Sequence, residues 1–274
     1  MYNNNKNCKD NYFDLLSIPA NIAHRGASGD YPENTMLSFE RAFEEGADAL
    51  ELDVRLTGDN EVVVFHDETL DRTTNGKGNL KDFSLKELQK LDAAYNFDAS
   101  NNFPYRGKGI RIPTLKEVLS HFNHKPIVIE VKKTGKYIAV QLEKIIKKAG
   151  AANRVLIASY DSQTKKRIRR LLPFTVSAAS RGEIINFHLK SKFGCSHLIK
   201  YYPFDALYLP ITYKGIRVLT PHLIRAAQRQ GIPIHVWTIN NIAEMETLLD
   251  WGVQGILTDY PSVLNKVNGI FISN

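Results

Sequence analysis

The sequence has few cysteines and no long apolar run. Its 274 residues include only two cysteines, Cys8 and Cys195, far apart in the chain. Two thiols are too few for a disulfide framework and lack the spacing of a metal site, so we expect both to be free. No stretch approaches the ~18 consecutive apolar residues of a transmembrane helix, and the opening residues lack the apolar core of a secretion signal. We therefore expect a cytoplasmic protein without a transmembrane segment.

Basic residues outnumber acidic residues, and the formal net charge is +7 at pH 7. Such an excess can indicate nucleic acid, an anionic membrane surface or a phosphorylated small molecule as partner. Much of it lies in residues 144–148 and 165–170, at helical spacing beside isoleucine and leucine. This pattern is typical of the solvated face of an amphipathic helix, so we expect no nucleic-acid partner. The oligomeric state stays open.

Two kinds of segment alternate along the chain, and their order predicts the fold class. Short apolar or β-branched runs have strand length, and amphipathic patterns of helical period separate them. An α/β chain of this length with about eight such units predicts a (β/α)₈ TIM barrel. An open doubly wound sheet is the alternative, but no Gly-rich dinucleotide loop follows any strand. The expected strands span residues 20–24, 48–55, 61–66, 126–131, 154–158, 174–179, 206–210, 232–238 and 254–258. The expected helices span residues 35–47, 114–122, 136–150, 162–172, 221–231 and 242–252.

Residues 67–112 interrupt this alternation with sequence rich in Gly, Asn, Asp and aromatic residues. A connection of this length is usually functional. We interpret residues 1–274 as one barrel domain, with an insertion at approximately 67–112 that starts from a strand end near the site.

Charged and apolar residues alternate in "ALELDVRL", residues 49–56. The period of two places Glu51, Asp53 and Arg55 on one strand face, which in a barrel is the interior. Two inward carboxylates at close range are unfavourable unless a cation joins them. In "PIVIEVKK", residues 126–133, Glu130 adds a third carboxylate on the same face as Lys132.

All-oxygen ligation by Glu51, Asp53 and Glu130 suits a hard divalent ion, Mg²⁺ or Ca²⁺, with Mn²⁺ as a further candidate. The competing interpretation is an internal salt-bridge network with Arg55 and Lys132.

Two histidines end expected strands, each followed by a charged residue: His24 precedes Arg25, and His66 precedes Asp67. Histidine titrates near neutrality, so the pair can supply one general base and one general acid. Arg25 offers a fork of donors that matches phosphate geometry.

Five stretches together resemble the glycerophosphodiester phosphodiesterase family, in order and spacing over nearly the whole chain. They are "AHRGASGDYPENT", "ELDVRLTGDNEVVVFHDETLDRTTNGKG", "IEVK", "VWTIN" and "LTDYP". The resemblance implies a barrel, a divalent metal, and hydrolysis of small glycerophosphodiesters to glycerol 3-phosphate and an alcohol.

Residue by residue, the resemblance implies that His24 and His66 are the catalytic pair and that Glu51, Asp53 and Glu130 are the metal ligands. It implies that Arg25 and Lys132 contact the phosphate.

Trp237 and Asp259 also match the family. We interpret Trp237 as an apolar wall of the substrate pocket and Asp259 as a structural hydrogen-bond acceptor. We interpret Glu33 and Asn34 of "PENT" as helix-capping residues. Two other functions stay open: a phospholipase D or sphingomyelinase D type of lipid hydrolase, and a non-catalytic barrel that binds phosphorylated ligands.

Overall fold

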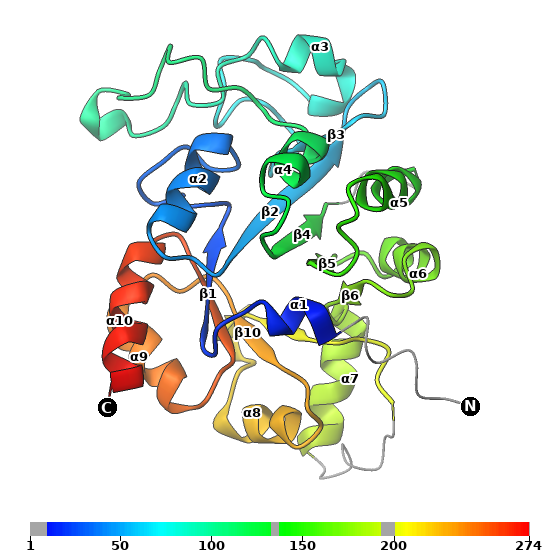
Figure 1. Cartoon of the computed structure of the whole chain (residues 1–274), viewed down its shortest axis with the longest axis vertical. Helices are drawn as coiled ribbons and strands as arrows, with labels where there is room; N and C mark the ends of the chain where they lie inside the picture. Colours follow the sequence, from blue (N-terminus) through cyan, green and yellow to red (C-terminus); the bar gives the residue numbers. More distant parts are fainter. Residues whose placement is uncertain (1–9, 133–136, 193–200, 274) are drawn as a thin grey trace.

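Eight parallel strands form the centre of the molecule, with helices around them (Figure 1). The computed structural model describes residues 10–132, 137–192 and 201–273, so Cys8 and Cys195 lie outside the described residues. The strands run in chain order around the ring, which is the order expected for a barrel. They are β1 (Ala20–His24), β2 (Ala49–Leu56), β4 (Ile127–Val131), β5 (Val155–Ala158), β6 (Val176–Ser177), β7 (Leu207–Leu209), β10 (Ile234–Val236) and β11 (Gly255–Thr258).

The ring closes between β6 and β7 through one parallel bridge, Ala178 with Ala206. The amides of Ala179 and Asp205 also donate across this seam, to the carbonyls of Ala206 and Ser177. All other neighbouring strands pair directly, in the order β6-β5-β4-β2-β1-β11-β10-β7. The (β/α)₈ barrel is confirmed, and the open doubly wound sheet is excluded because the two end strands meet.

One helix follows each barrel strand and packs outside it (Figure 1). These helices are α2 (Met36–Glu44), α4 (Leu115–His121), α5 (Ile138–Lys148), α6 (Ser162–Leu171), α7 (Arg181–Lys192), α8 (Pro221–Gln228), α9 (Ile242–Asp250) and α10 (Pro261–Ser273). The six helices predicted from periodicity are all present. Periodicity did not reveal α7 or α10, and in α7 only Phe187 and Ser191 are buried, so its sequence carries no apolar stripe.

Apolar side chains divide into an interior core and an outer layer. Inside the ring lie small and medium residues such as Ala49, Val128 and Leu156. The short helix α1 (Asp10–Asp14) adds the buried Tyr12 to this interior core. The alternate residues of the same strands, such as Leu50 and Ile129, pack outward against the helices. This division follows from the strand period and directs the alternating charged residues of β2 inward.

The expected strand at residues 61–66 is not a barrel strand. It forms β3 (Val62–Val64), which pairs antiparallel with the end of β2. The connection from Leu56 to Val62 is far too short for a parallel crossover, which needs a dozen or more residues. Instead, β2 continues past the ring and β3 returns, so that the amide of Phe65 donates to the carbonyl of Asp53 at 2.9 Å. This return brings His66 back to the level of the carboxylates.

The segment 67–112 lies between β3 and α4 and projects beyond the ring (Figure 1). It contains only short helical turns: η1 (Leu80–Asp82), α3 (Leu85–Leu88) and η2 (Ala99–Asn101). A separate small core of Leu70, Leu80 and Leu88 packs under it against Val63 of β3. A second excursion, the hairpin β8 (Thr212–Tyr213) and β9 (Ile216–Arg217), follows β7. Among the described residues, no helix combines the length and the apolar character that crossing a membrane requires.

Candidate active site

Three carboxylates meet inside the carboxyl-terminal end of the ring. Asp53 of β2 is directly opposite Glu130 of β4, and Glu51 lies two residues before Asp53 on the same face. One ligand oxygen from each of the three lies within 4.8 Å of the others. Glu51 and Asp53 are buried and Glu130 is half-buried. The strand alternation therefore predicted the direction of these side chains correctly.

Two cations already pair with this cluster. Lys132 Nζ lies 2.8 Å from Asp53 Oδ1 and 2.5 Å from Glu130 Oε1. Arg25 Nε lies 3.2 Å from the other oxygen of Asp53. The salt-bridge network that competed with the metal interpretation is thus present around Lys132. Arg55 takes a different position, where its Nε donates to the carbonyl of His66 at 2.8 Å.

The pKa values of the two buried carboxylates move in opposite directions. Burial, reinforced by the charge of Asp53, raises the pKa of Glu51 to about 8. Burial also opposes ionisation of Asp53, but Lys132 and Arg25 outweigh it and hold the pKa of Asp53 below its usual range. The cations already present therefore do not offset the burial of Glu51 and the charge of Asp53 beside it. An additional cation fits these residues, and a purely oxygen donor set suits a hard divalent ion.

His24, the last residue of β1, is held by a carboxylate from the far end of the chain. Its Nδ1 lies 2.7 Å from Asp259 Oδ1. Ser28 Oγ donates to the same oxygen, and Asn240 Nδ2 donates to Oδ2 at 2.6 Å. Burial lowers the pKa of His24, but Asp259 and Glu51 raise it more, so the net pKa lies above the ordinary value. Asp259 is therefore the hydrogen-bond acceptor that we expected.

His66 has a similar partner but a different support. Its Nδ1 lies 2.6 Å from Oδ1 of the adjacent Asp67. Arg72 donates to the second oxygen of Asp67 and, with two nitrogens, to Glu33 at 2.6 and 2.8 Å. Burial lowers the pKa of His66 below the ordinary value despite the charge of Asp53. Arg72 belongs to the insertion, and no local sequence pattern connects it with Glu33, which lies 39 residues earlier.

The capping interpretation of Glu33 and Asn34 is wrong. Thr35 is the N-cap of α2, with its side chain accepting from the amide of Ser38. Asn34 instead donates to Asp53 Oδ2 at 2.9 Å and accepts from the amide of Asp53. Glu33 bridges Arg25 and Arg72. The N-cap is one residue later than expected because Thr35 completes a reciprocal capping box with Ser38, which frees the two preceding side chains for the site.

The turn after β1 leaves no space for a side chain at Gly26. Its φ is +83°, and a Cβ atom there would lie 2.5 Å from Ser38 Oγ. This close approach allows the loop to pack on α2 while the amide of Arg25 donates to Glu51 Oε2 at 3.2 Å. The glycine thus serves the packing that positions Arg25.

Trp237 follows β10 at the same end of the ring, where it packs on the interior core. Its ring lies edge to face with Tyr160, at 6.2 Å between centroids. Desolvation and the charges of Glu130 and Glu51 raise the pKa of Tyr160. Tyr160 is thus an aromatic neighbour of Trp237, and the sequence reasoning missed it because an isolated tyrosine after a strand carries no signal.

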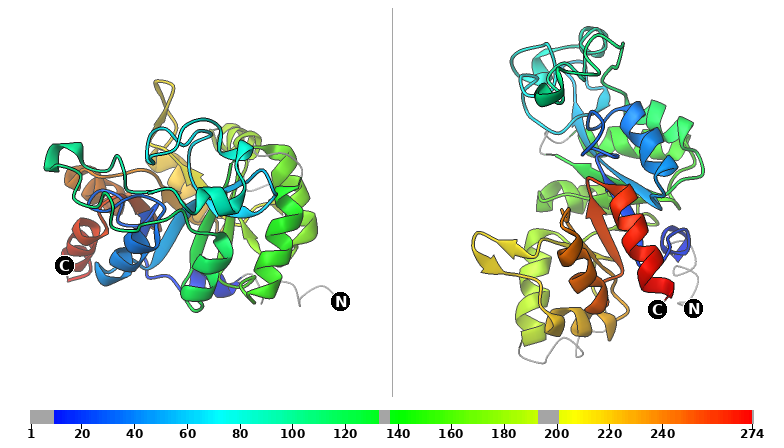
Figure 2. Two further views of the ribbon diagram at one scale, coloured as in Figure 1. Left: turned by 90° about the horizontal axis from the view of Figure 1, so that it is seen from above. Right: turned by 90° about the vertical axis from the view of Figure 1, so that its left-hand side faces the viewer.

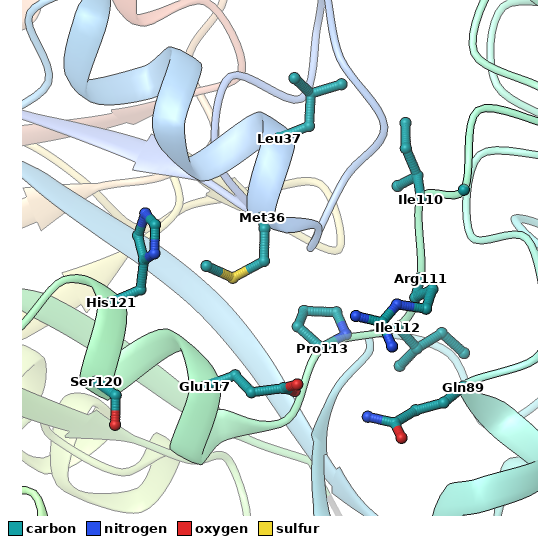
Figure 3. Close-up of a pocket in the computed structure, with 11 residues that line it drawn as sticks. Met36, Leu37, Gln89, Ile110, Arg111, Ile112, Pro113, Glu117, Ser120 and His121 are labelled. Atoms are coloured by element: carbon teal, nitrogen blue, oxygen red, sulfur yellow. The ribbon is translucent and has the colours of Figure 1, made fainter.

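A pocket lies away from these residues, on the flank of the barrel between α2, α4 and the insertion (Figure 3). Its volume is about 630 Å³, and its lining includes Met36, Ile110 and His121. None of the predicted site residues lines it. Size therefore does not identify the site here; the convergence of charged groups does.

The sequence and the fold are similar to those of known phosphodiesterases. A glycerophosphodiester phosphodiesterase of Bacillus subtilis (strain 168) is 35% identical over 266 residues, covering 90% of this chain and 85% of that protein. One from Caldanaerobacter subterraneus subsp. tengcongensis is 35% identical over 248 residues, covering 89% and 95%. The crystal structure of glycerophosphodiester phosphodiesterase from Agrobacterium tumefaciens has a TM-score of 0.71 at 25% identity, covering 89% of this chain and 98% of that one.

The match to a whole family spans nearly the entire barrel. Residues 24–263 match the Glycerophosphoryl diester phosphodiesterase family, from His24 at the end of β1 to the first turn of α10. This range contains every residue of the site described above. The chain therefore belongs to the glycerophosphoryl diester phosphodiesterase family, a family of phosphoric diester hydrolases.

Proposed function

We propose that this protein hydrolyses small glycerophosphodiesters to glycerol 3-phosphate and an alcohol, with His24 and His66 as the proton-transfer pair. The observation that carries the proposal is the placement of the two rings. Each has its Nδ1 held by a carboxylate and each borders one carboxylate of β2: His24 is opposite Glu51, and Phe65, just before His66, pairs with Asp53. We treat residues 1–274 as one barrel domain with the 67–112 insertion, and the cytoplasmic location stays a prediction.

Glu51, Asp53 and Glu130 would hold a divalent cation, Mg²⁺ or Ca²⁺, with Mn²⁺ as a further candidate. When bound, such an ion neutralises phosphodiester charge that otherwise repels a nucleophile. Arg25 and Lys132, which already face Asp53 from two sides, would add charged donors for the phosphate oxygens. Trp237 would contact the apolar part of the substrate.

The carboxylate contacts support an assignment of the ring nitrogens. Because ionised Asp259 and Asp67 can only accept, we assign a proton to Nδ1 of each histidine. Nε2 of each ring is then available to the substrate. One ring is neutral, and its Nε2 accepts a proton from the attacking hydroxyl. The other ring is an imidazolium, and its Nε2 donates a proton to the departing alkoxide, each step typically worth ~10²–10⁴-fold.

Metal removal tests the proposal. We expect EDTA to abolish hydrolysis of glycerophosphocholine and added Mg²⁺, Ca²⁺ or Mn²⁺ to restore it. A thermal melt of the chelated protein is the control, because the barrel should stay folded without the ion. Hydrolysis that survives exhaustive chelation would contradict the role assigned to the three carboxylates.

A substrate screen separates the remaining functions. We expect glycerophosphocholine and glycerophosphoethanolamine to be turned over faster than lysophosphatidylcholine. Preference for the lysophospholipid would favour the lipid hydrolases, and binding of glycerol 3-phosphate without turnover of any diester would favour a binding barrel.

A further inference from the structure

The β8–β9 hairpin projects from the end of the barrel that contains the site. It follows β7, so it begins at the carboxyl ends of the parallel strands. In the left view of Figure 2 it extends further than any other element, and both chain termini lie toward the opposite end. Whatever approaches this end of the barrel along its axis therefore meets the hairpin early.

The tip of the hairpin has a defined shape. Lys214 and Gly215 have φ values of 50° and 77°, so both turn residues are left-handed. Two left-handed residues form the tight turn that matches the twist of a two-stranded ribbon. All of residues 212–217 are exposed. Ile216 is 71% exposed and Tyr213 40% exposed, although neither residue type favours water.

Within the hairpin the charged side chains are all basic. Residues 212–217 contain Lys214 and Arg217 and no Asp or Glu. Arg181, from the start of α7, places its guanidinium 5.1 Å from the centre of the Tyr213 ring. Exposed apolar side chains thus stand directly beside cations with no neighbouring acid in the segment.

This combination fits an anionic lipid surface. Apolar side chains gain by leaving water for the interfacial region, and basic side chains gain from the negative surface potential of the lipids. Tyrosine is favoured at that depth, where its ring is apolar and its hydroxyl is wet. A soluble polyanion would bind the basic side chains, but it would not explain why Ile216 is exposed.

We propose that the β8–β9 hairpin is a docking surface for an anionic phospholipid membrane, with Ile216 and Tyr213 entering the interface and Lys214 contacting lipid headgroups. Docking through this hairpin turns the carboxylate end of the barrel toward the membrane. Phosphodiesters released at a lipid surface would then meet the site directly. The inference goes beyond the proposed reaction and does not depend on it.

Vesicle sedimentation tests this inference. The probes are vesicles of phosphatidylglycerol and, for comparison, of phosphatidylcholine. We expect the protein to bind phosphatidylglycerol vesicles, Ile216→Asp to weaken this binding about tenfold or more, and Lys214→Gln to weaken it about fivefold. Ile270→Asp and Lys266→Gln are matched controls on α10; Ile270 is 66% exposed, close to the value for Ile216. Both controls should bind as the unmodified protein does.

Turnover of glycerophosphocholine in the absence of vesicles should be the same in all four variants, which separates docking from catalysis. No binding to phosphatidylglycerol, or equal losses in the hairpin and control variants, would overturn the inference. Heparin serves as a soluble polyanion for comparison. If binding decreases with salt, is not weakened by Ile216→Asp and also occurs with heparin, the basic residues of the hairpin would be assigned to a soluble polyanion instead.

Discussion

His24 and His66 each contact one carboxylate through Nδ1, but they depend on different parts of the fold. His24 ends a barrel strand, and the carboxylate that holds it follows β11, the neighbouring strand in the ring. His66 lies on the return from β3, outside the ring, and its carboxylate is held by Arg72 of the insertion. The first arrangement depends on barrel closure, and the second depends on an insertion with its own small core.

Under the proposed function, this difference means that the barrel alone constructs only half of the proton-transfer pair. The pKa shifts follow the same division: the surroundings raise the pKa of His24 and lower that of His66. Groups whose surroundings separate their pKa values are suited to opposite roles in acid–base catalysis. Under the proposed function, the insertion therefore contributes to catalysis even though it supplies no residue of the carboxylate cluster.

The largest effect is expected from removing either ring. His24→Ala and His66→Ala should each lower kcat by ~10²-fold or more, with little change in stability, because each ring performs a proton transfer. The double variant should lose much less than the product of the two, since the pair acts as a unit. Steady-state kinetics on glycerophosphocholine measures this.

A nitrophenyl ester sharpens the assignment, because a good leaving group needs little help from an acid. It should restore turnover in only one of the two alanine variants, the one that lacks the acid. Near-normal rates in both single variants would return the histidines to structural roles.

A smaller effect is expected from the residues that hold the carboxylates of Asp67 and Asp259, because these residues differ between the two histidines. Arg72→Gln removes the contacts that hold Asp67, and Asn240→Ala removes a donor that holds Asp259. We expect each to lower kcat about tenfold with little change in KM, as for lost positioning hydrogen bonds. Arg72→Lys should recover part of the loss.

The nitrophenyl ester again separates the two sides. Arg72→Gln should respond to it as His66→Ala does, and Asn240→Ala as His24→Ala does. Identical responses of Arg72→Gln and Asn240→Ala would mean that the supports are not independent.

The smallest effect on turnover concerns a different histidine, His235 of β10, which has no carboxylate partner in the described structure. It is buried, and its Nδ1 lies 2.8 Å from the hydroxyl of Tyr208. Burial lowers the pKa of His235 to about 3. The ordinary value is about 6.5, so the unfolded chain takes up the proton first as the pH falls.

Stability should therefore be constant above pH ~6.5 and fall as the pH decreases toward about 3, by about 2 kcal/mol at pH ~5. In His235→Gln this part of the pH dependence should disappear, while turnover near neutral pH stays within about threefold. Chemical denaturation at several pH values measures the difference. An unchanged pH dependence in His235→Gln would contradict the assignment.

The sequence predicted most of the fold because strand and helix periods alternate clearly. It did not predict the antiparallel direction of β3, since the composition of Val62–Val64 is the same as that of a barrel strand. The informative signal was the connection: residues 57–61 are too few for a parallel crossover. Connection length, rather than strand composition, distinguishes the hairpin from the ring.

The site was predictable where it lies on strands and not where it lies on loops. Alternation within β2 determined the direction of Glu51 and Asp53, so their meeting with Glu130 followed from strand pairing. The link between Arg72 and Glu33 joins two loops, whose paths have no period to interpret. Its existence depends on the packing of the whole insertion.

The contact between His24 and Asp259 spans 235 residues of sequence. Asp53 and Glu130, in contrast, belong to strands that are neighbours in the ring as well as successive ring strands along the chain. Contacts of such different sequence separation close loops of different entropy, and the longer loop costs more to close. During refolding, the carboxylate cluster needs only a fragment of the barrel, whereas His24 is oriented only after the last strand has joined the first. Under the proposed function, recovery of hydrolysis would therefore report the completed ring, and recovery of cation binding would report a fragment of it.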